Sequence, residues 1–292
     1  MIVSTIAQGM LWSILGLGIF MTFRILNFPD MTTEGSFPLG GAVAVTVINK
    51  GFSPMVATLL GIFAGMLAGF ITGLLYTKGK IPIILSGILV MTSTNSVMLF
   101  VMGRSNLSLG DLPRIQYFLK FLHLPGDFNI VILGVIAIFV IIVFMLSFFD
   151  TRLGQAYIAT GDNEVMARSM GIHTDNMKLL GLSVSNGIIA LSGALICQND
   201  GQADIGKGIG VIVIGLAAII IGEVIFGELT MMERMIAIVV GSIFYQLLIL
   251  AVIKLGFATE YLKIFAAIIL AICLMIPELR KKFQLNVVRW TK

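Results

Sequence analysis

Few residues of this chain stand in an arrangement that could do chemistry, and the most suggestive is the run GQADIGKG at residues 201–208. It imitates the phosphate-binding pattern G-x-x-x-x-G-K, in which backbone amides and a lysine hold phosphate. That pattern requires Ser or Thr directly after the lysine to bind magnesium, whereas Gly208 follows Lys207 here. The run also joins two hydrophobic segments instead of a buried strand and a helix. We therefore expect no nucleotide site.

Histidine and cysteine give no better candidate. His123 and His173 each stand alone in a polar segment, and Cys197 and Cys273 lie at or within hydrophobic segments. None has a second ligand at the spacing of a metal site, and no Ser, His and Asp fall on one face. We expect solvated histidines and packed cysteines, with no catalytic residue, metal or cofactor in this chain.

Composition places the chain in a membrane. Of its 292 residues 58% are hydrophobic and only 12% charged, and the mean hydropathy is +1.04. A helix needs about 20 apolar residues to cross the hydrocarbon core. Six charge-free runs reach that length, at residues 1–23, 51–77, 81–103, 128–149, 179–199 and 235–253. Shorter charge-free runs occupy residues 35–49, 208–222 and 264–277.

These runs predict an all-α fold, a polytopic transmembrane bundle of about nine spans with a range of eight to ten. Continuous apolar runs exclude a β-barrel, whose strands alternate apolar and polar residues. An outside N-terminus and a cytoplasmic C-terminus assign 12 of the 19 Lys and Arg residues to the cytoplasm, in keeping with the positive-inside rule. Residues 150–178 then form a cytoplasmic loop, residues 104–127 an extracytoplasmic one, and the net charge of +4 requires no nucleic acid.

Two polar segments precede the short runs. Residues 27–41 and residues 199–210 each carry two acids about four residues apart, Asp30 with Glu34 and Asp200 with Asp204. They are either an inverted repeat, as transporters often contain, or two ordinary loops. Pro29 and Pro38 predict irregular backbone in the first, which at membrane depth is tolerated only beside protein or a water-filled cavity. The predicted wall of a substrate path comprises Asn27, Pro29, Asp30, Thr33 and Glu34.

Two further features lie inside apolar runs. Gly61, Gly65, Gly69 and Gly73 recur every four residues, which predicts a helix face that a neighbouring backbone approaches closely. Glu223 is either a functional intramembrane acid or a residue at a helix end near the cytoplasm, and we favour the helix end.

The polar stretch ATGDNEVMARSMGIHTDNMK, residues 159–178, contrasts with the rest of the chain. Gly161 offers a break, and Asp162 and Asn163 offer side chains that can cap a helix. Glu164 suits its first turn, and Gly171 suits the position after its end. Glu164 and Arg168 are spaced to pair on a helix of two turns. A helix this short needs a surface to dock on, whether membrane, bundle or partner protein.

The pattern G-Q-A-x-x-A-T-G-x-N-x-x-x-A-x-x-x-G-I at residues 154–172 resembles the coupling loop of the branched-chain amino acid and ribose permease superfamily of ABC importers. The stretch LGLGIFMTFRILNFPDMTTEGSFPLGGAVA resembles the opening of that superfamily. The stretches GVIVIGLAAIIIGEVIFG and YLKIFAAIILAICLMIPELR resemble, more narrowly, permeases of tryptophan/tyrosine transport systems.

The resemblance implies a permease subunit that pairs with a second copy, binds cytoplasmic ATPase subunits and receives substrate from an extracytoplasmic binding protein. ATP and magnesium would reside on the ATPase. The residues carried over to the coupling helix are Gly161, Asn163, Glu164, Ala167, Arg168 and Gly171. The expected cargo is an amino acid, with aromatic ones favoured and branched-chain amino acids, nucleosides or sugars as alternatives. An ion-coupled secondary transporter is the alternative mechanism, and a membrane scaffold or channel is a third class.

Overall fold

The computed structural model describes residues 2–117, 128–227 and 229–255, together with five single positions at 264, 267, 268, 271 and 275. In chain order the helices are α1 (Ile2–Ile19), the π-helix η1 (Phe20–Ile25), α2 (Thr33–Asn49), α3 (Pro54–Thr77), α4 (Ile83–Met102), α5 (Phe128–Asp150), α6 (Arg152–Asp162), α7 (Glu164–Ser169), α8 (Thr174–Asp200), the 3-10 turn η3 (Ile205–Gly208), α9 (Val211–Phe226) and α10 (Met231–Lys254). The strands β1 (Asn106–Ser108) and β2 (Gln202–Asp204) form one antiparallel pair.

Local signals explain where several helices begin and end. Ser53 accepts a hydrogen bond from the Val56 amide at the start of α3, where Pro54 takes the first helical position. Thr230 and Glu233 form a capping box at the start of α10. Gly201, with φ +75°, ends α8 in the left-handed conformation that glycine adopts without steric cost.

Seven helical segments of the described residues are long and apolar enough to cross a membrane: α1 with η1, α3, α4, α5, α8, η3 with α9, and α10. The predicted run 35–49 lies within α2, a largely buried helix of 17 residues. The predicted span 264–277 falls largely outside the described residues, and the five single positions described there are helical. The structure therefore confirms a polytopic helical bundle.

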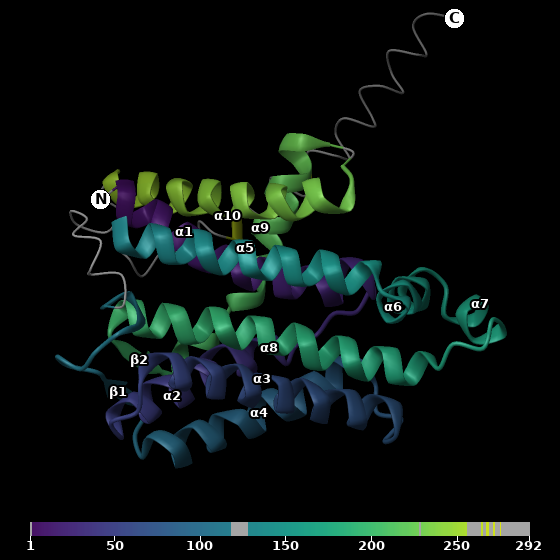
Figure 1. Ribbon diagram of the computed structural model, residues 1–292, viewed down its shortest axis with the longest axis horizontal. Helices are drawn as coiled ribbons and strands as arrows, with labels where there is room; N and C mark the ends of the chain where they lie inside the picture. The colour runs from purple at the N-terminus through teal and green to yellow at the C-terminus, as the bar shows by residue number, and fades with distance from the viewer. Residues whose placement is uncertain are drawn as a thin grey trace, which may run out of the picture.

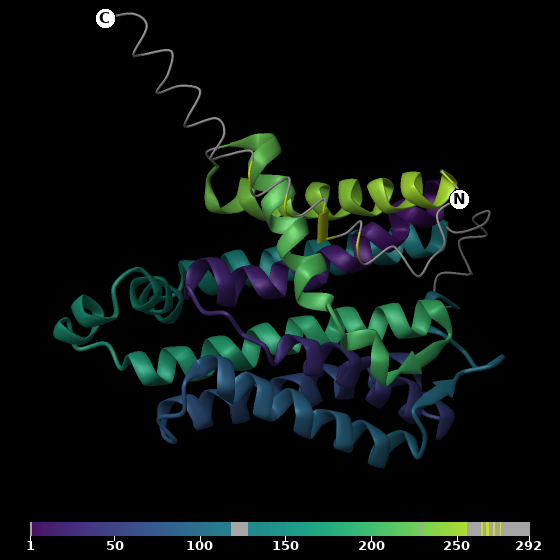
Figure 2. The same ribbon diagram turned by 180° about the vertical axis from the view of Figure 1, so that it is seen from behind.

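The helices form two groups that lie side by side (Figures 1 and 2). One group contains α1, α5, α9 and α10, and the other contains α2, α3, α4 and α8. Contacts between α1 and α8 join them. The most enclosed of the seven spanning segments is α8, and α1, α2 and α3 pack against it.

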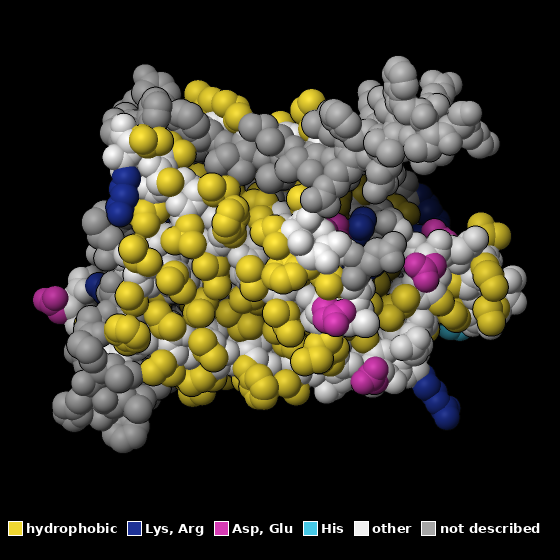
Figure 3. Space-filling view, turned by 90° about the horizontal axis from the view of Figure 1, so that it is seen from above, with side chains coloured by type: hydrophobic (Ala, Val, Ile, Leu, Met, Phe, Trp, Pro, Cys, Tyr) yellow, Lys and Arg dark blue, Asp and Glu magenta, His cyan; other side chains and the backbone are white. Residues whose placement is uncertain are grey.

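The two ends of the bundle carry different structures. Helices α6 and α7 project at one end, called here the α7 end, and β1 with β2 lies at the opposite end. Between the ends, hydrophobic side chains cover the visible surface and charged side chains lie toward the ends (Figure 3). Such a band suits contact with lipid.

Glycines allow α3 to pack closely on its neighbours. A Cβ atom added at Gly65 or Gly69 would collide with α8, at Ala190 or the Leu182 carbonyl, and one at Gly61 would lie 2.8 Å from the Gly40 carbonyl oxygen of α2. A Cβ at Gly73 would meet the Leu179 backbone at 3.1 Å. The four-residue spacing thus brings α3 against α8 over most of its length.

We expect Gly69→Leu to destabilise the bundle, because the new side chain would occupy the space of the Leu182 carbonyl. Overpacking of this kind costs about 1–3 kcal/mol or more. Thermal unfolding in detergent measures it, and Leu67→Phe is the matched control because it adds bulk to an exposed position of α3. An unfolding temperature equal to wild type for Gly69→Leu would contradict this account of the contact.

Candidate functional site

The chain breaks its helical path between η1 and α2. Residues 26–32 are not helical, and Asn27 adopts a positive φ of +56°. The Phe28 amide donates to the Thr22 carbonyl at 2.9 Å, and the Asn27 side-chain amide donates to the Gly161 carbonyl of α6 at 3.2 Å. Pro29 has no amide hydrogen to satisfy. This segment, called here the helix break, therefore has protein partners for its polar groups.

Asp30 is the acid that the break brings into the interior, with 2% of its surface exposed. Its carboxylate accepts hydrogen bonds from the Thr32 amide at 2.9 Å and from the Asn186 side chain at 2.7 Å. Asn186 in turn accepts from the Ser36 hydroxyl at 2.6 Å. Because Asn186 lies near the midpoint of α8, Asp30 lies at about half the depth of the bundle. A buried carboxylate needs such partners to offset its desolvation.

The two polar segments singled out in the sequence meet in the structure. Glu34, in the first turn of α2, accepts a hydrogen bond at 3.0 Å from the Gly210 amide, which precedes α9. Thr33 lies beside them and donates to the Asp30 carbonyl at 3.0 Å.

The acids of the second segment have a different setting. Asp200 pairs with Lys207 at 2.5 Å, and Asp204 accepts from the Gly206 amide at 2.6 Å. Both lie near the β-strand end of the bundle rather than at half depth.

Helix α7 follows the predicted pattern. The Asn163 side chain caps it by accepting from the Met166 amide at 3.0 Å, and Gly171, with φ +83°, lies just beyond its end. Gly161 packs against the Ile25 carbonyl at the end of η1, and Ala167 is buried. The Tyr157 hydroxyl of α6 also donates to η1, at the Met21 carbonyl, at 2.6 Å.

The outer side of α7 is apolar and exposed. Val165, Met166 and Met170 have 80%, 61% and 70% of their surfaces exposed at a helix that projects beyond the bundle (Figure 1). By contrast, the predicted coupling residues Gly161 and Ala167 face the bundle. The three exposed side chains, called here the α7 apolar surface, resemble the buried core of a protein interface more than a solvated surface.

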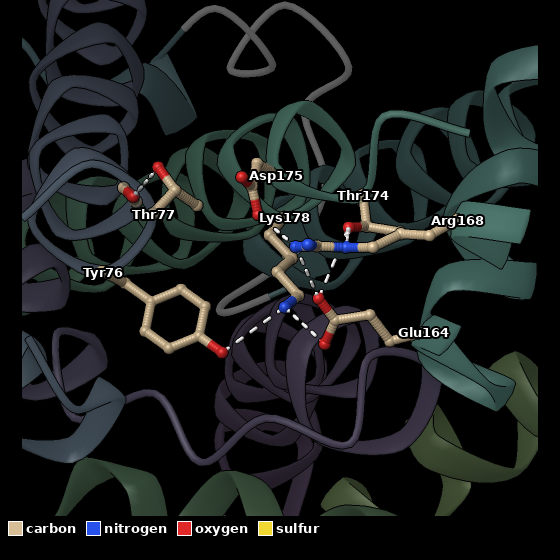
Figure 4. Close-up of polar contacts among 8 residues, drawn as sticks. Tyr76, Thr77, Glu164, Arg168, Thr174, Asp175 and Lys178 are labelled. Carbon is tan, nitrogen blue, oxygen red and sulfur yellow. Dashed lines mark hydrogen bonds and ion pairs between the residues drawn. The ribbon is translucent and has the colours of Figure 1, made fainter. Parts of the chain in front are cut away.

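A cluster of charges fixes the inner side of α7 to α8 (Figure 4). Glu164 pairs with Arg168 at 3.0 Å, as its spacing predicts, and with Lys178 at 2.7 Å. Arg168 also pairs with Asp175 at 2.9 Å and donates to the Thr174 hydroxyl at 2.7 Å. The Lys178 side chain is only 7% exposed. This set of residues is called the charge cluster.

The charge cluster keeps Glu164 ionised. The hydrogen bond from Lys178 lowers the pKa of Glu164 below its ordinary value of 4.5, and Arg168 adds a smaller effect in the same direction. A lowered carboxyl pKa stabilises the fold above the ordinary pKa, and the contribution is lost as the pH falls through the lowered one. The cluster is therefore intact at neutral pH.

A polar run in α4 was missed by the sequence analysis. Residues 92–96 read TSTNS in the middle of the helix, and Thr92, Ser93 and Ser96 are exposed on the bundle. Thr92 and Ser93 donate to backbone carbonyls of their own helix, whereas among the described residues the Asn95 side chain has no hydrogen-bond partner. Five successive polar residues inside an otherwise apolar run were the available signal.

The structure also places other residues that the sequence singled out, namely the intramembrane acid, one cysteine and one histidine. Glu223, near the end of α9, pairs with Arg24 of η1 at 2.9 Å. Cys197 is buried and His173 is exposed before α8, while His123 and Cys273 lie outside the described residues. Within the part of the chain that the structure describes, no group of His, Cys, Asp and Glu could hold a metal ion.

Known proteins include relatives whose alignments cover most of this chain. A tyrosine transport system permease protein of Clostridioides difficile is 40% identical over 270 residues, covering 92% of this chain and 88% of the relative. An uncharacterized protein of Rickettsia prowazekii is 32% identical over 94% of this chain and 96% of its own length. An autoinducer 2 import system permease protein of Yersinia pseudotuberculosis is 30% identical over 63% of this chain and 52% of its own length. No solved structure matches.

The family described as the permease component of branched-chain amino acid transport systems matches residues 1–274. Its members are transport components and not enzymes. Since the described part of this chain contains seven helices able to span a membrane, the chain is a multi-pass protein of the plasma membrane. The chain belongs to the family of permease components of branched-chain amino acid transport systems.

Proposed function

We propose that this chain is the permease subunit of an ATP-driven importer of an amino acid, and that aromatic amino acids are its preferred cargo. The tyrosine transport permease that shares 40% of its residues supports this choice of cargo. In the proposed assembly two copies of the chain form the path, separate ATPase subunits bind on the cytoplasmic side and carry ATP and magnesium, and an extracytoplasmic binding protein delivers the substrate.

The observation that carries the proposal is the α7 apolar surface. Val165, Met166 and Met170 would be costly to leave in water, and they stand on a helix whose inner side is held by ion pairs. A rigid helix with an exposed apolar side is suited to insertion in a groove of a partner. We assign residues 150–178 to the cytoplasm as the coupling loop and the β-strand end, with residues 104–127, to the outside.

The proposed path runs past the helix break. Asn27, Pro29, Asp30, Thr33 and Glu34 lie on non-helical or newly started backbone. Asp30 lies at about half depth, and Asn27, which contacts Gly161 of α6, lies nearer the α7 end. Polar side chains exposed at mid-membrane are expected to face protein or a water-filled cavity. The polar run of α4 supports a path between two copies of the chain, with Asn95 and Ser96 facing it.

An ion-coupled secondary transporter is the alternative that Asp30 favours, since such carriers use buried acids. The two mechanisms differ in energy source. Uptake of labelled tyrosine into proteoliposomes that contain this chain and its ATPase, with the binding protein supplied on the substrate side, tests them, because only the ATP-driven importer stops without ATP under a maintained ion gradient.

We expect Val165→Asp combined with Met170→Asp to remove the ATPase from the complex. A charge placed on the α7 apolar surface would be desolvated in the partner groove without a counter-charge. Co-purification of the ATPase from detergent measures this, and we expect a loss of at least about tenfold. Met232→Asp is the control for each single change, because it places one carboxylate at another exposed apolar residue. Full retention of the ATPase by the double variant would refute the docking surface.

We expect Gly161→Leu to abolish uptake while the chain remains in the membrane. The added side chain would occupy the position of the Ile25 carbonyl and displace α6 and α7 from η1. Gly103→Asn is the control, because the residue lies outside the coupling loop, asparagine tolerates the left-handed conformation and a Cβ there meets no atom within 4 Å. Unchanged uptake by Gly161→Leu would show that this packing is dispensable.

We expect Ser96→Cys to react with a charged, membrane-impermeant thiol reagent in a chain that also carries Cys197→Ala and Cys273→Ala. A charged reagent enters a water-filled path but not hydrocarbon. Phe139→Cys on α5, 67% exposed and in the middle of its helix, is the lipid-facing control, and we expect it to react at least about tenfold more slowly. Equal protection of both cysteines would remove α4 from the path.

A further inference from the structure

Lys178 occupies an unusual position for a lysine near a helix end. It lies in the second turn of α8, and its side chain is only 7% exposed. Its ammonium nitrogen is 2.7 Å from Glu164 of α7 and 3.4 Å from the hydroxyl of Tyr76 in α3 (Figure 4). One enclosed cation therefore links its own helix, α8, to both α7 and α3.

Tyr76 extends this contact to the helix break. The Lys178 ammonium lies 5.0 Å from the centre of the Tyr76 ring, a distance that allows a cation–π interaction. The rings of Tyr76 and Phe28 pack edge to face, with their centroids 4.9 Å apart and an interplanar angle of 84°. Phe28 is 7% exposed and precedes Asp30 by two residues. A continuous series of contacts thus joins α7 to the break.

The ion pair between Lys178 and Glu164 makes this series of contacts resist separation. An ammonium removed from water needs its anionic partner, so moving Glu164 away from Lys178 would leave an uncompensated charge. Arg168 and Asp175 hold Glu164 and α7 in place from the other side. A displacement of α7 therefore either moves Lys178 with it or breaks the Lys178–Glu164 pair. Because Tyr76 contacts Lys178 and Phe28 contacts Tyr76, a movement of Lys178 also moves these two rings.

We propose that Lys178 is a positioning residue that transmits displacement of α7 to the helix break through Tyr76 and Phe28. The proposal rests on the proposed function, in which an ATPase docks on α7 and moves it. Under this assignment the ATPase acts on the path wall near Asp30 through an enclosed cation, in addition to the backbone contacts that α6 makes with η1.

The test measures the exposure of the helix break itself, so the substrate need not be known. The complex of this chain with the ATPase that co-purifies with it is placed in lipid nanodiscs, and amide hydrogen exchange of residues 26–32 and of α7 is measured with and without ATP. We expect ATP to change exchange in both segments of the wild-type chain. In Lys178→Met we expect the change in residues 26–32 to fall by about threefold or more, while that of α7 is retained.

Two further variants separate transmission from loss of folding. Tyr76→Ala leaves the Lys178–Glu164 pair in place and should reduce the response of residues 26–32 as much as Lys178→Met, with no additional loss in the double variant, because both act in one series. Lys178→Arg should restore part of the response. Lys78→Met is the matched control, because it removes an exposed lysine just beyond α3.

The outcomes are distinct. A wild-type response of residues 26–32 in Lys178→Met, or no response to ATP there in the wild-type chain, would overturn the proposal. Loss of the ATPase from the Lys178→Met complex would overturn it too, since Lys178 would then act in docking. If no ATPase co-purifies even with the wild-type chain, the proposed function itself fails.

Discussion

The hydrocarbon core offers a backbone no water, so a helix can stop inside a membrane protein only where other protein groups take over its hydrogen bonds. The helix break at residues 26–32 meets this condition with groups drawn from distant parts of the chain. Asn186 and Ser36 complete the environment of Asp30, and Gly161 accepts from Asn27. Because these partners lie on α2, α6 and α8, the irregular segment exists only when the bundle has assembled around it.

The α7 end divides two tasks between the two sides of a very short helix. A helix of six residues is unstable alone, and here the charge cluster supplies the stability that its length cannot. The α7 apolar surface is therefore not needed to hold the helix on the bundle. Such a division explains why the predicted coupling residues, Gly161 and Ala167 in particular, face inward, while the exposed Val165 and Met170 fall outside the family pattern.

Much of the fold followed from sequence, because hydrophobic length and charge are local properties. The charge-free runs within the described residues matched helices to within about five residues, and Asn163, one of the two candidate caps, and Gly171 bounded α7. The π-helix η1 and the enclosure of Lys178 were not predictable in this way. Lys178 reads in sequence as one more solvated cation, and its contact with Tyr76 arises only once the glycines of α3 let that helix approach α8. The polar run of α4 was visible in the sequence, but its exposure depends on which helices cover it.

The hydrogen bond between Glu34 and the Gly210 amide has a mechanical consequence. It joins the starts of two helices that run away from it, α2 toward the β-strand end and α9 toward the α7 end. If α2 and α9 slid apart, the amide and the carboxylate would both lose their partner in a medium of low dielectric. Since α2 belongs to one group of helices and α9 to the other, this bond is a second link between the two groups, beside the contacts of α1 with α8.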